Sequence, residues 1–165
     1  MNKIVSLADN SAVYDVAKVT PLSIAVQISE RFGNQIYLKR EDEQSIHSFK
    51  LRGAYQKMSS LSDVQKIKGV VASSAGNHAQ GVALSAKKLK IRAVIVMPSS
   101  TPKIKVQAVK QLGAEVILHG DVYDDAFQHA KKLCSEQDLN FIHPYDDIDV
   151  IAGQATVAKE ILSQL

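Results

Sequence analysis

The sequence predicts an α/β fold, in which helices cover both faces of a parallel sheet. Three observations carry this prediction. Four short runs rich in β-branched residues begin 23, 22 and 25 residues apart. A helical pattern of apolar residues separates successive runs, and strands that alternate with helices in this way form the βαβ units of a parallel sheet. The composition, with 45% hydrophobic and 22% charged residues, is that of a globular domain.

The four runs are the expected strands, at residues 70–73, 93–97, 115–118 and 140–143. Apolar residues recur at three- and four-residue intervals in the segments beside them, which predicts helices with one face in the core. Thr101 followed by Pro102 predicts a helix N-cap with proline in the first position, and Gly113 lies where that helix should end. The two clearest apolar stripes consist of Leu51, Ala54, Tyr55 and Met58, and of Tyr123, Ala126, Phe127, Ala130, Leu133 and Cys134.

The segments outside this repeat suggest further elements. Residues 20–28 alternate partly between apolar and polar, and residues 35–40 follow a Gly-Asn pair, which predicts a β-hairpin. After the repeat, a last amphipathic helix runs to the end of the chain on the apolar residues Ala155, Ala158, Ile161, Leu162 and Leu165. We therefore divide the chain into an N-terminal segment (1–50), a small α/β domain (51–150) and a terminal helix (151–165).

Composition excludes several classes of function. The chain has nine aromatic residues, no tryptophan and a net charge of +3 with its bases interspersed among acids, which argues against nucleic acid as a partner. No apolar run approaches the ~18 residues of a membrane span, and the apolar patch between Lys3 and Asp9 is too short for a signal peptide. A single cysteine, Cys134, offers neither a disulfide nor a metal-ligand spacing. We expect a cytoplasmic protein without a metal.

One candidate functional residue is Lys50, which stands at the start of the predicted helix in residues 51–58. A lysine in the first turn meets the positive end of the helix dipole, which favours the neutral amine that Schiff-base chemistry requires. A solvated lysine at a helix end is the alternative, and position alone favours it.

The second candidate segment is the run of small and polar residues at 73–81, which follows a predicted strand and opens a helix. Ligands of parallel α/β sheets bind beyond the carboxyl ends of the strands, where the N–H groups of a helix N-terminus attract carboxylate or phosphate. Asn77 adds a donor and an acceptor. An ordinary βα turn with Asn77 as the cap explains the same residues equally well.

Taken together, SFKLRGA at 48–54 and ASSAGNHAQG at 72–81 resemble the fold-type II pyridoxal phosphate enzymes. The flanking runs VYDVAKVTPL, YLKRED, TPKIKVQAVKQLGAEV and VIAGQ are similar to those of the biosynthetic threonine dehydratases within that family. The resemblance extends from about Val13 to Leu165, and its motifs stand in the family's order and spacing. It implies the small domain of a fold-type II enzyme plus part of a large domain.

The resemblance also implies roles for particular residues. Lys50 would bind pyridoxal 5'-phosphate covalently, Phe49 would lie against its pyridine ring, and Asn77 would hydrogen-bond the ring's 3-oxygen. The substrate carboxylate would be held by the loop Ser74, Ala75, Gly76 and Asn77, with His78 beside it. We interpret Arg52 as structural, since an arginine two residues from an active lysine more often pairs with a carboxylate. We expect no ligand role for His47, His119, His129 and His143.

The implied reaction converts L-threonine to 2-oxobutanoate and ammonia, as in isoleucine biosynthesis. The amine of Lys50 would remove the α proton, and the cofactor would act as the electron sink. An amino acid is thus the expected small-molecule substrate.

The sequence departs from the family in one respect. None of its eight glycines is adjacent to another, so the family's glycine-rich cradle for the cofactor phosphate is absent. The resemblance implies that the polar residue facing the ring nitrogen, and the regulatory domain, belong to later parts of the enzyme. We therefore expect the amino-terminal part of a longer enzyme, which is inactive alone and forms a homo-oligomer through exposed apolar faces.

Three alternatives remain open at this point. The chain could belong to another fold-type II enzyme acting on serine or threonine, such as a serine racemase or a degradative dehydratase. It could be a non-catalytic α/β module that binds a small anion at residues 74–77. It could also be an inert fragment.

Overall fold

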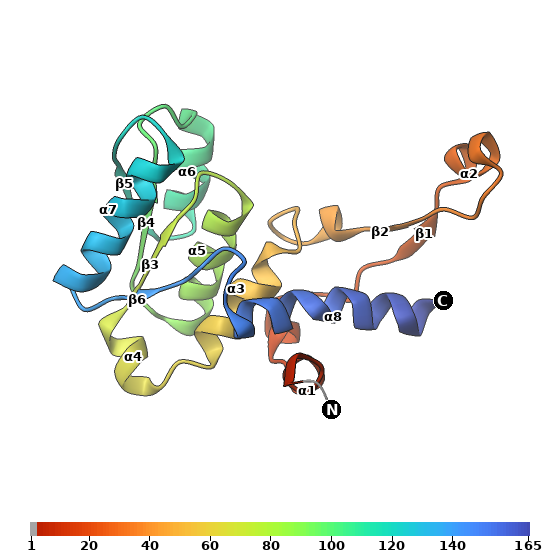
Figure 1. The fold of residues 1–165 in the computed structure, drawn as a ribbon, viewed down its shortest axis with the longest axis horizontal. Coiled ribbons are helices and arrows are strands. Elements are labelled where there is room, and N and C mark those ends of the chain that lie inside the picture. The colour runs from red at the N-terminus through yellow and green to blue at the C-terminus, as the bar shows by residue number, and fades with distance from the viewer. Residues whose placement is uncertain (1–2) are drawn as a thin grey trace.

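The computed structural model describes residues 3–165 and contains the predicted parallel sheet (Figure 1). Its strands lie in the order β5-β4-β3-β6 and pair in parallel throughout. Three of them have the predicted bounds: β3 (Val70–Ser73), β4 (Ala93–Met97) and β5 (Glu115–Leu118). The fourth, β6 (Asn140–Phe141), is two residues shorter than expected, because only these residues pair with β3.

Helices cover both faces of this sheet, as predicted. On one face α3 (Lys50–Ser59), α5 (Asn77–Leu89) and α6 (Lys103–Gln111) contribute Met58, Val82 and Val109 to one apolar cluster with Ile95 of β4. On the other face α7 (Tyr123–Glu136) packs Ala126, Ala130 and Leu133 against Val71, Val94 and Val96. A short helix, α4 (Asp63–Lys68), precedes β3. Because both faces are covered, every residue of β3 and β4 is buried.

The start of α6 differs from the prediction by one residue. Pro102 occupies the N-cap position with φ −55°, and the first helical residue is Lys103. Thr101 does not cap the helix, and its buried hydroxyl has no hydrogen-bond partner among the described residues. At the other end Gly113, with φ +94°, follows the helix as expected.

An extended arm precedes α3. It begins with α1 (Lys3–Asp9) and a 3-10 turn, η1 (Val13–Asp15), continues through β1 (Leu22–Ile24), α2 (Val26–Phe32) and β2 (Tyr37–Lys39), and ends in η2 (Glu41–Glu43). The strands β1 and β2 pair antiparallel, so the predicted hairpin is present. The alternation at residues 26–28 was misleading, however, because those residues belong to α2. Figure 1 shows β1, α2 and β2 reaching away from the sheet, whereas α1 lies beside the last helix of the chain.

The last helix, α8 (Ile148–Gln164), runs from the sheet out beside the arm (Figure 1). Asp147 caps it, accepting hydrogen bonds from the backbone N–H groups of Asp149 and Val150. The helix crosses α3 closely at Gly153, where an added Cβ would lie 2.6 Å from the carbonyl oxygen of Arg52. Since α8 begins at Ile148, the domain boundary expected at residue 150 falls inside a helix.

Within residues 3–165, none of the helices combines the length and the apolar character that crossing a bilayer requires.

Candidate active site

The strand order predicts a ligand-binding crevice at the carboxyl edge of the sheet. The chain leaves β3 toward β4 and β5 on one side, whereas β6 pairs with β3 on the other side. The loops after the neighbouring strands β3 and β6 therefore diverge from each other. Open α/β sheets bind ligands at such a point, beyond the carboxyl ends of the strands. These loops are residues 74–76 and residues 142–147, and Lys50 and His78 both contact the second one.

Lys50 is the first residue of α3, as predicted, and its side chain turns toward the crevice. Its ammonium Nζ donates a hydrogen bond of 2.9 Å to the carbonyl oxygen of Pro144. Partial burial lowers the pKa of this amine below its ordinary value, because removal from water disfavours the charged form. Lys50 therefore loses its proton to give the neutral, nucleophilic amine more readily than a solvated lysine does.

Gly81 holds the start of α3 close to α5. A Cβ added at Gly81 would lie 2.9 Å from the carbonyl oxygen of Lys50 and 3.2 Å from the backbone nitrogen of Leu51. Only a glycine permits the two helix backbones to approach this closely. This contact fixes Lys50 relative to the helix whose N-terminus faces the crevice.

The loop before α5 presents backbone donors. Gly76 is the N-cap residue without a side-chain cap, and its own N–H donates to the hydroxyl oxygen of Ser74 over 3.2 Å. The N–H groups of the first helical turn, from Asn77 onward, have no i−4 carbonyl to bind. The Asn77 side chain is exposed and forms no hydrogen bond within residues 3–165. Together with half-buried Ala75, these groups form a small surface suited to an anion.

His78 differs from the loop residues before it, 74–77, because its side chain is buried. Only 4% of the residue is exposed, and its ring Nε2 lies 3.0 Å from the carbonyl oxygen of Ile142. Since a carbonyl only accepts, Nε2 carries the ring proton. Burial, reinforced by the nearby Lys50 and His143, lowers the pKa of His78 to about 4, so the imidazole is neutral at physiological pH.

Two buried polar atoms at this edge have no partner within the described residues, namely Nδ1 of His78 and the hydroxyl of Ser73. Unsatisfied buried groups are uncommon, and at a crevice they indicate a place where a ligand or water completes the bonding.

Phe49 lies beside Lys50 with 40% of its surface exposed. The Lys50 Nζ is 5.4 Å from the centroid of its ring. The ring borders a cavity of about 310 Å³ whose other walls come from α8, at Gln154, Val157, Ala158 and Ile161. An exposed aromatic face next to the lysine is suited to a flat ring.

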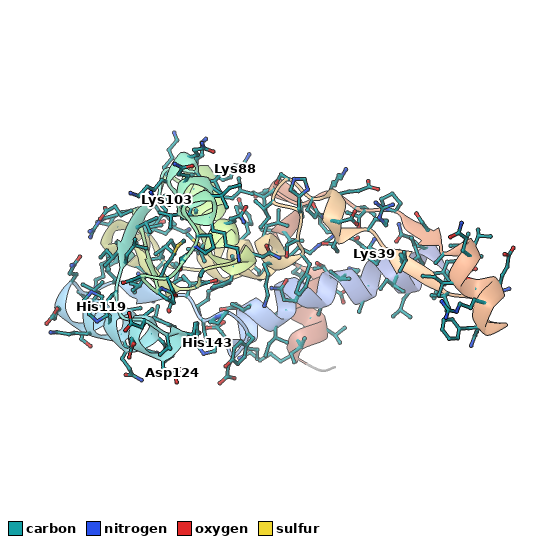
Figure 2. The ribbon with its side chains drawn as sticks, turned by 90° about the horizontal axis from the view of Figure 1, so that it is seen from above. Lys39, Lys88, Lys103, His119, Asp124 and His143 are labelled. Carbon is teal, nitrogen blue, oxygen red and sulfur yellow. The ribbon has the colours of Figure 1, made fainter. Side chains whose placement is uncertain are left out.

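Arg52 confirms the structural interpretation. Its guanidinium is fully buried and binds Glu41 at 2.8 Å and Glu160 at 2.6 Å. Lys39, which is labelled in Figure 2, reaches the same Glu160 at 2.6 Å. Two cations therefore balance two carboxylates. This buried cluster joins the arm, α3 and α8.

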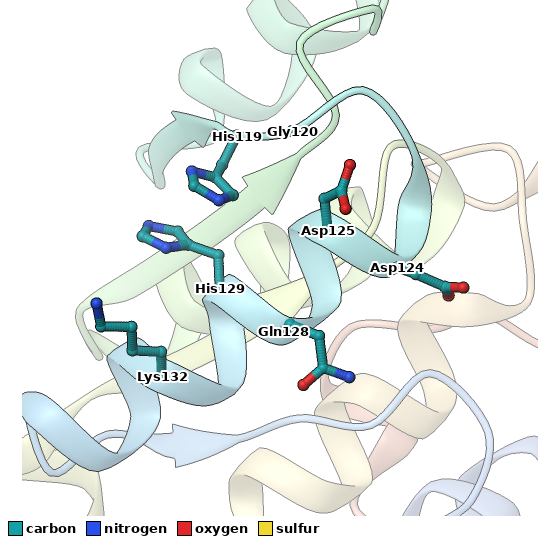
Figure 3. A pocket seen from close by; sticks show the side chains of 7 residues that line it. All are labelled: His119, Gly120, Asp124, Asp125, Gln128, His129 and Lys132. Carbon is teal, nitrogen blue, oxygen red and sulfur yellow. The ribbon is translucent and has the colours of Figure 1, made fainter.

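Two of the other histidines, His119 and His129, lie away from this site. His119 and His129 stack with centroids 4.0 Å apart in an open cavity of about 480 Å³ at the carboxyl end of β5 (Figure 3). None of the residues lining it belongs to the predicted site, and no cluster of metal-ligating side chains occurs within residues 3–165.

Residues 13–165 match the protein family described as pyridoxal-phosphate dependent enzyme. The chain belongs to this family. It is 56% identical to the biosynthetic L-threonine dehydratase of Pasteurella multocida and 58% identical to the chloroplastic biosynthetic threonine dehydratase of Arabidopsis thaliana, each over 94% of this chain. The chain spans only 30% and 26% of those enzymes' lengths.

Solved structures of this family have the same fold. The processed form of threonine deaminase isoform 2 from Solanum lycopersicum superposes with a TM-score of 0.96 at 49% identity, over 99% of this chain and 45% of that one. Maize serine racemase gives 0.92 at 34% identity, over 98% of this chain and 49% of that one. The fold class predicted from the sequence is therefore confirmed.

The residues present fit the family's cofactor. The crevice offers a half-buried lysine with a lowered pKa, an adjacent aromatic face, a free amide at Asn77 and two unpartnered buried polar atoms. The sequence pointed to Lys50 through its position at a helix start, and the family resemblance pointed to Phe49 and Asn77. The sequence did not predict the backbone carbonyls of Ile142 and Pro144, because carbonyl groups leave no trace in residue type. Only the position of this loop after a predicted strand points to it.

Proposed function

We propose that this chain forms the lysine-bearing part of a pyridoxal 5'-phosphate-dependent threonine dehydratase, which converts L-threonine to 2-oxobutanoate and ammonia. The observation that carries the proposal is the position of the Lys50 amine. It is half-buried at the crevice between the loops after β3 and β6 and has a lowered pKa. The similarity to enzymes named threonine dehydratase supports the choice of substrate.

Each site residue has a task in this proposal. Lys50 forms the covalent link to the cofactor, the ring of Phe49 lies against the pyridine, and the Asn77 amide binds the 3-oxygen. The substrate carboxylate is held by Ser74, Ala75, Gly76, Asn77 and His78. His78 contributes its backbone N–H, because its side chain is buried against Ile142.

The bound cofactor would supply an electron sink for the negative charge that develops at the substrate Cα. Lys50 then acts through its neutral amine, which takes the α proton at Nζ. Partial burial favours this neutral form before the proton arrives. The N–H groups at the start of α5 hold the carboxylate in the orientation that exposes the α proton to Lys50.

The domain division also becomes a proposal. Residues 1–50 would belong to a large domain, residues 51–150 would form the small domain, and residues 151–165 would lead back to the large domain. We also propose a cytoplasmic location, an amino acid as the small-molecule partner rather than nucleic acid or membrane, and assembly as a homo-oligomer.

A chimera tests the function. The segment of the Pasteurella multocida enzyme that aligns with this chain is replaced by this chain, and ammonia release from L-threonine and L-serine is measured with added cofactor. We expect turnover with threonine, and none in the matched chimera with Lys50→Ala. A folded chimera that takes up cofactor without releasing ammonia from threonine would contradict the proposal, and turnover with serine alone would assign a different substrate.

A further inference from the structure

The loop between β6 and α8, residues 142–147, is attached to the site at several points. Lys50 of α3 donates to the carbonyl of Pro144, and His78 of α5 donates to the carbonyl of Ile142. Two helices that carry proposed site residues thus hold the same short stretch of backbone. Lys50 is 94 residues from Pro144 in the sequence, and His78 is 64 residues from Ile142.

The loop also holds its own shape. The ring Nδ1 of His143 accepts hydrogen bonds from the backbone N–H groups of Asp146, at 2.7 Å, and of Tyr145, at 3.3 Å. At its far end Asp147 caps α8 and forms an ion pair of 2.8 Å with Lys57 of α3. The position of the Pro144 carbonyl therefore depends on contacts at both ends of the loop.

We propose that His78 is a positioning residue, which fixes the loop after β6 so that the carbonyl of Pro144 holds the Lys50 amine in place for cofactor binding. The inference rests on the proposed role of Lys50 and adds a role for the His78 side chain and for the loop. His78 acts through its hydrogen bond to Ile142, whereas Lys50 donates to Pro144.

The tautomer of His78 suits this role. Its Nε2 proton is donated to the Ile142 carbonyl, and the ring stays neutral because burial disfavours a charged ring, with a smaller effect from the nearby Lys50. A neutral ring at this position holds the loop without repelling the lysine. A glutamine places an amide donor at a similar reach and cannot become charged.

The experiment compares His78→Leu, which removes the donor, with His78→Gln, which retains one, in the cofactor-free chain. The first measurement is the pH dependence of acetic anhydride labelling at Lys50, followed by peptide mass spectrometry, with exposed Lys103 on α6 as the internal reference (Figure 2). In His78→Leu we expect the pKa of Lys50 to rise toward its ordinary value, because a displaced loop admits water. We expect His78→Gln to behave as the unchanged protein does.

The second measurement is amide hydrogen exchange. We expect the 142–147 peptide of His78→Leu to exchange at least tenfold faster, with the β4 peptide unchanged as evidence that the fold is intact. An unaltered pKa of Lys50 in a folded His78→Leu protein would overturn the proposal, and so would loop exchange equal in both variants. Neither measurement requires bound cofactor, so the role of Lys50 in cofactor binding is judged separately by the chimera.

Discussion

At the scale of single residues, burial sets the protonation states of the site. Lys50 and His78 are both shifted toward their neutral forms, Lys50 by partial burial and His78 by nearly complete burial. The two groups differ in what they can do chemically. A neutral lysine is a nucleophile and a base, whereas a histidine with a pKa of about 4 is too weak a base to take a proton at neutral pH. This difference favours Lys50 over His78 as the proton acceptor.

The lowered pKa of His78 predicts acid destabilisation in a defined range. The unfolded chain binds a proton at this histidine near pH 6.5, but the folded chain does so only near pH 4. Above pH 6.5 the neutral histidine therefore contributes its full share to the free energy of unfolding. As the pH falls from 6.5 toward 4, the free energy of unfolding decreases by about 3 kcal/mol in all, because the unfolded chain binds the proton first.

Urea unfolding between pH 7 and 4.5 measures this effect. His129 and His143 are shifted in the same direction, so the control is His78→Gln, which leaves those histidines unchanged. The unchanged protein should lose stability more steeply with falling pH than the variant. Parallel pH profiles for the two proteins would show that His78 is accessible to protons in the folded state.

At the scale of elements, close helix contacts position the site. Gly81→Ala adds a Cβ that would lie 2.9 Å from a backbone oxygen of α3, which cannot move away as a flexible side chain could. We expect a loss of about 1–2 kcal/mol, since the strain exceeds the ~1 kcal/mol by which alanine favours a helix over glycine.

Gly76→Ala is the matched control, because nothing lies within 4 Å of a Cβ added there. Thermal unfolding of both variants measures the difference. If Gly81→Ala is as stable as the control, α3 and α5 are less tightly held than the structure indicates.

The elements also show what the sequence could predict. The strands at 70–73 and 93–97 were recognisable because both sheet faces are covered, which requires uninterrupted apolar residues. The helix at 26–32 was missed because its residues are largely exposed and thus lack an apolar stripe, while Gly33, which ends it with φ +60°, also suits a hairpin turn. Motifs in the sequence made Lys50 and Asn77 candidates. The Pro144 and Ile142 carbonyls reach Lys50 and His78 only through folding of the chain over 94 and 64 residues, so no motif could indicate them.

At the scale of the whole molecule, the buried charge cluster of Arg52, Glu41, Glu160 and Lys39 connects the arm to the α/β part. Glu160→Gln leaves two buried cations with one carboxylate, and breaking a buried pair in this way costs about 3–5 kcal/mol. Chemical unfolding should show a loss of that order.

Glu136→Gln provides the comparison, because Glu136 forms only a surface pair of 3.7 Å with Lys132 on α7. This variant should leave stability almost unchanged. Equal effects of the two substitutions would mean that the cluster does not hold the arm in place.

The arm also exposes apolar side chains, including Phe32 at 67%, Val26 at 53% and Ile24 at 50%. Such surfaces commonly pair with another chain, so we expect a homo-oligomer. Light scattering should give a mass above 18.0 kDa that rises with concentration. A mass near 18.0 kDa over a wide concentration range would rule out self-association.

Borohydride reduction of the protein mixed with pyridoxal 5'-phosphate, followed by peptide mapping, tests whether Lys50 is the residue that binds the cofactor. We predict that the label is concentrated on the peptide containing Lys50 and that Lys50→Arg loses most of it. Label distributed over the exposed lysines with no preference for Lys50, or undiminished labelling of Lys50→Arg, would show that Lys50 does not bind the cofactor.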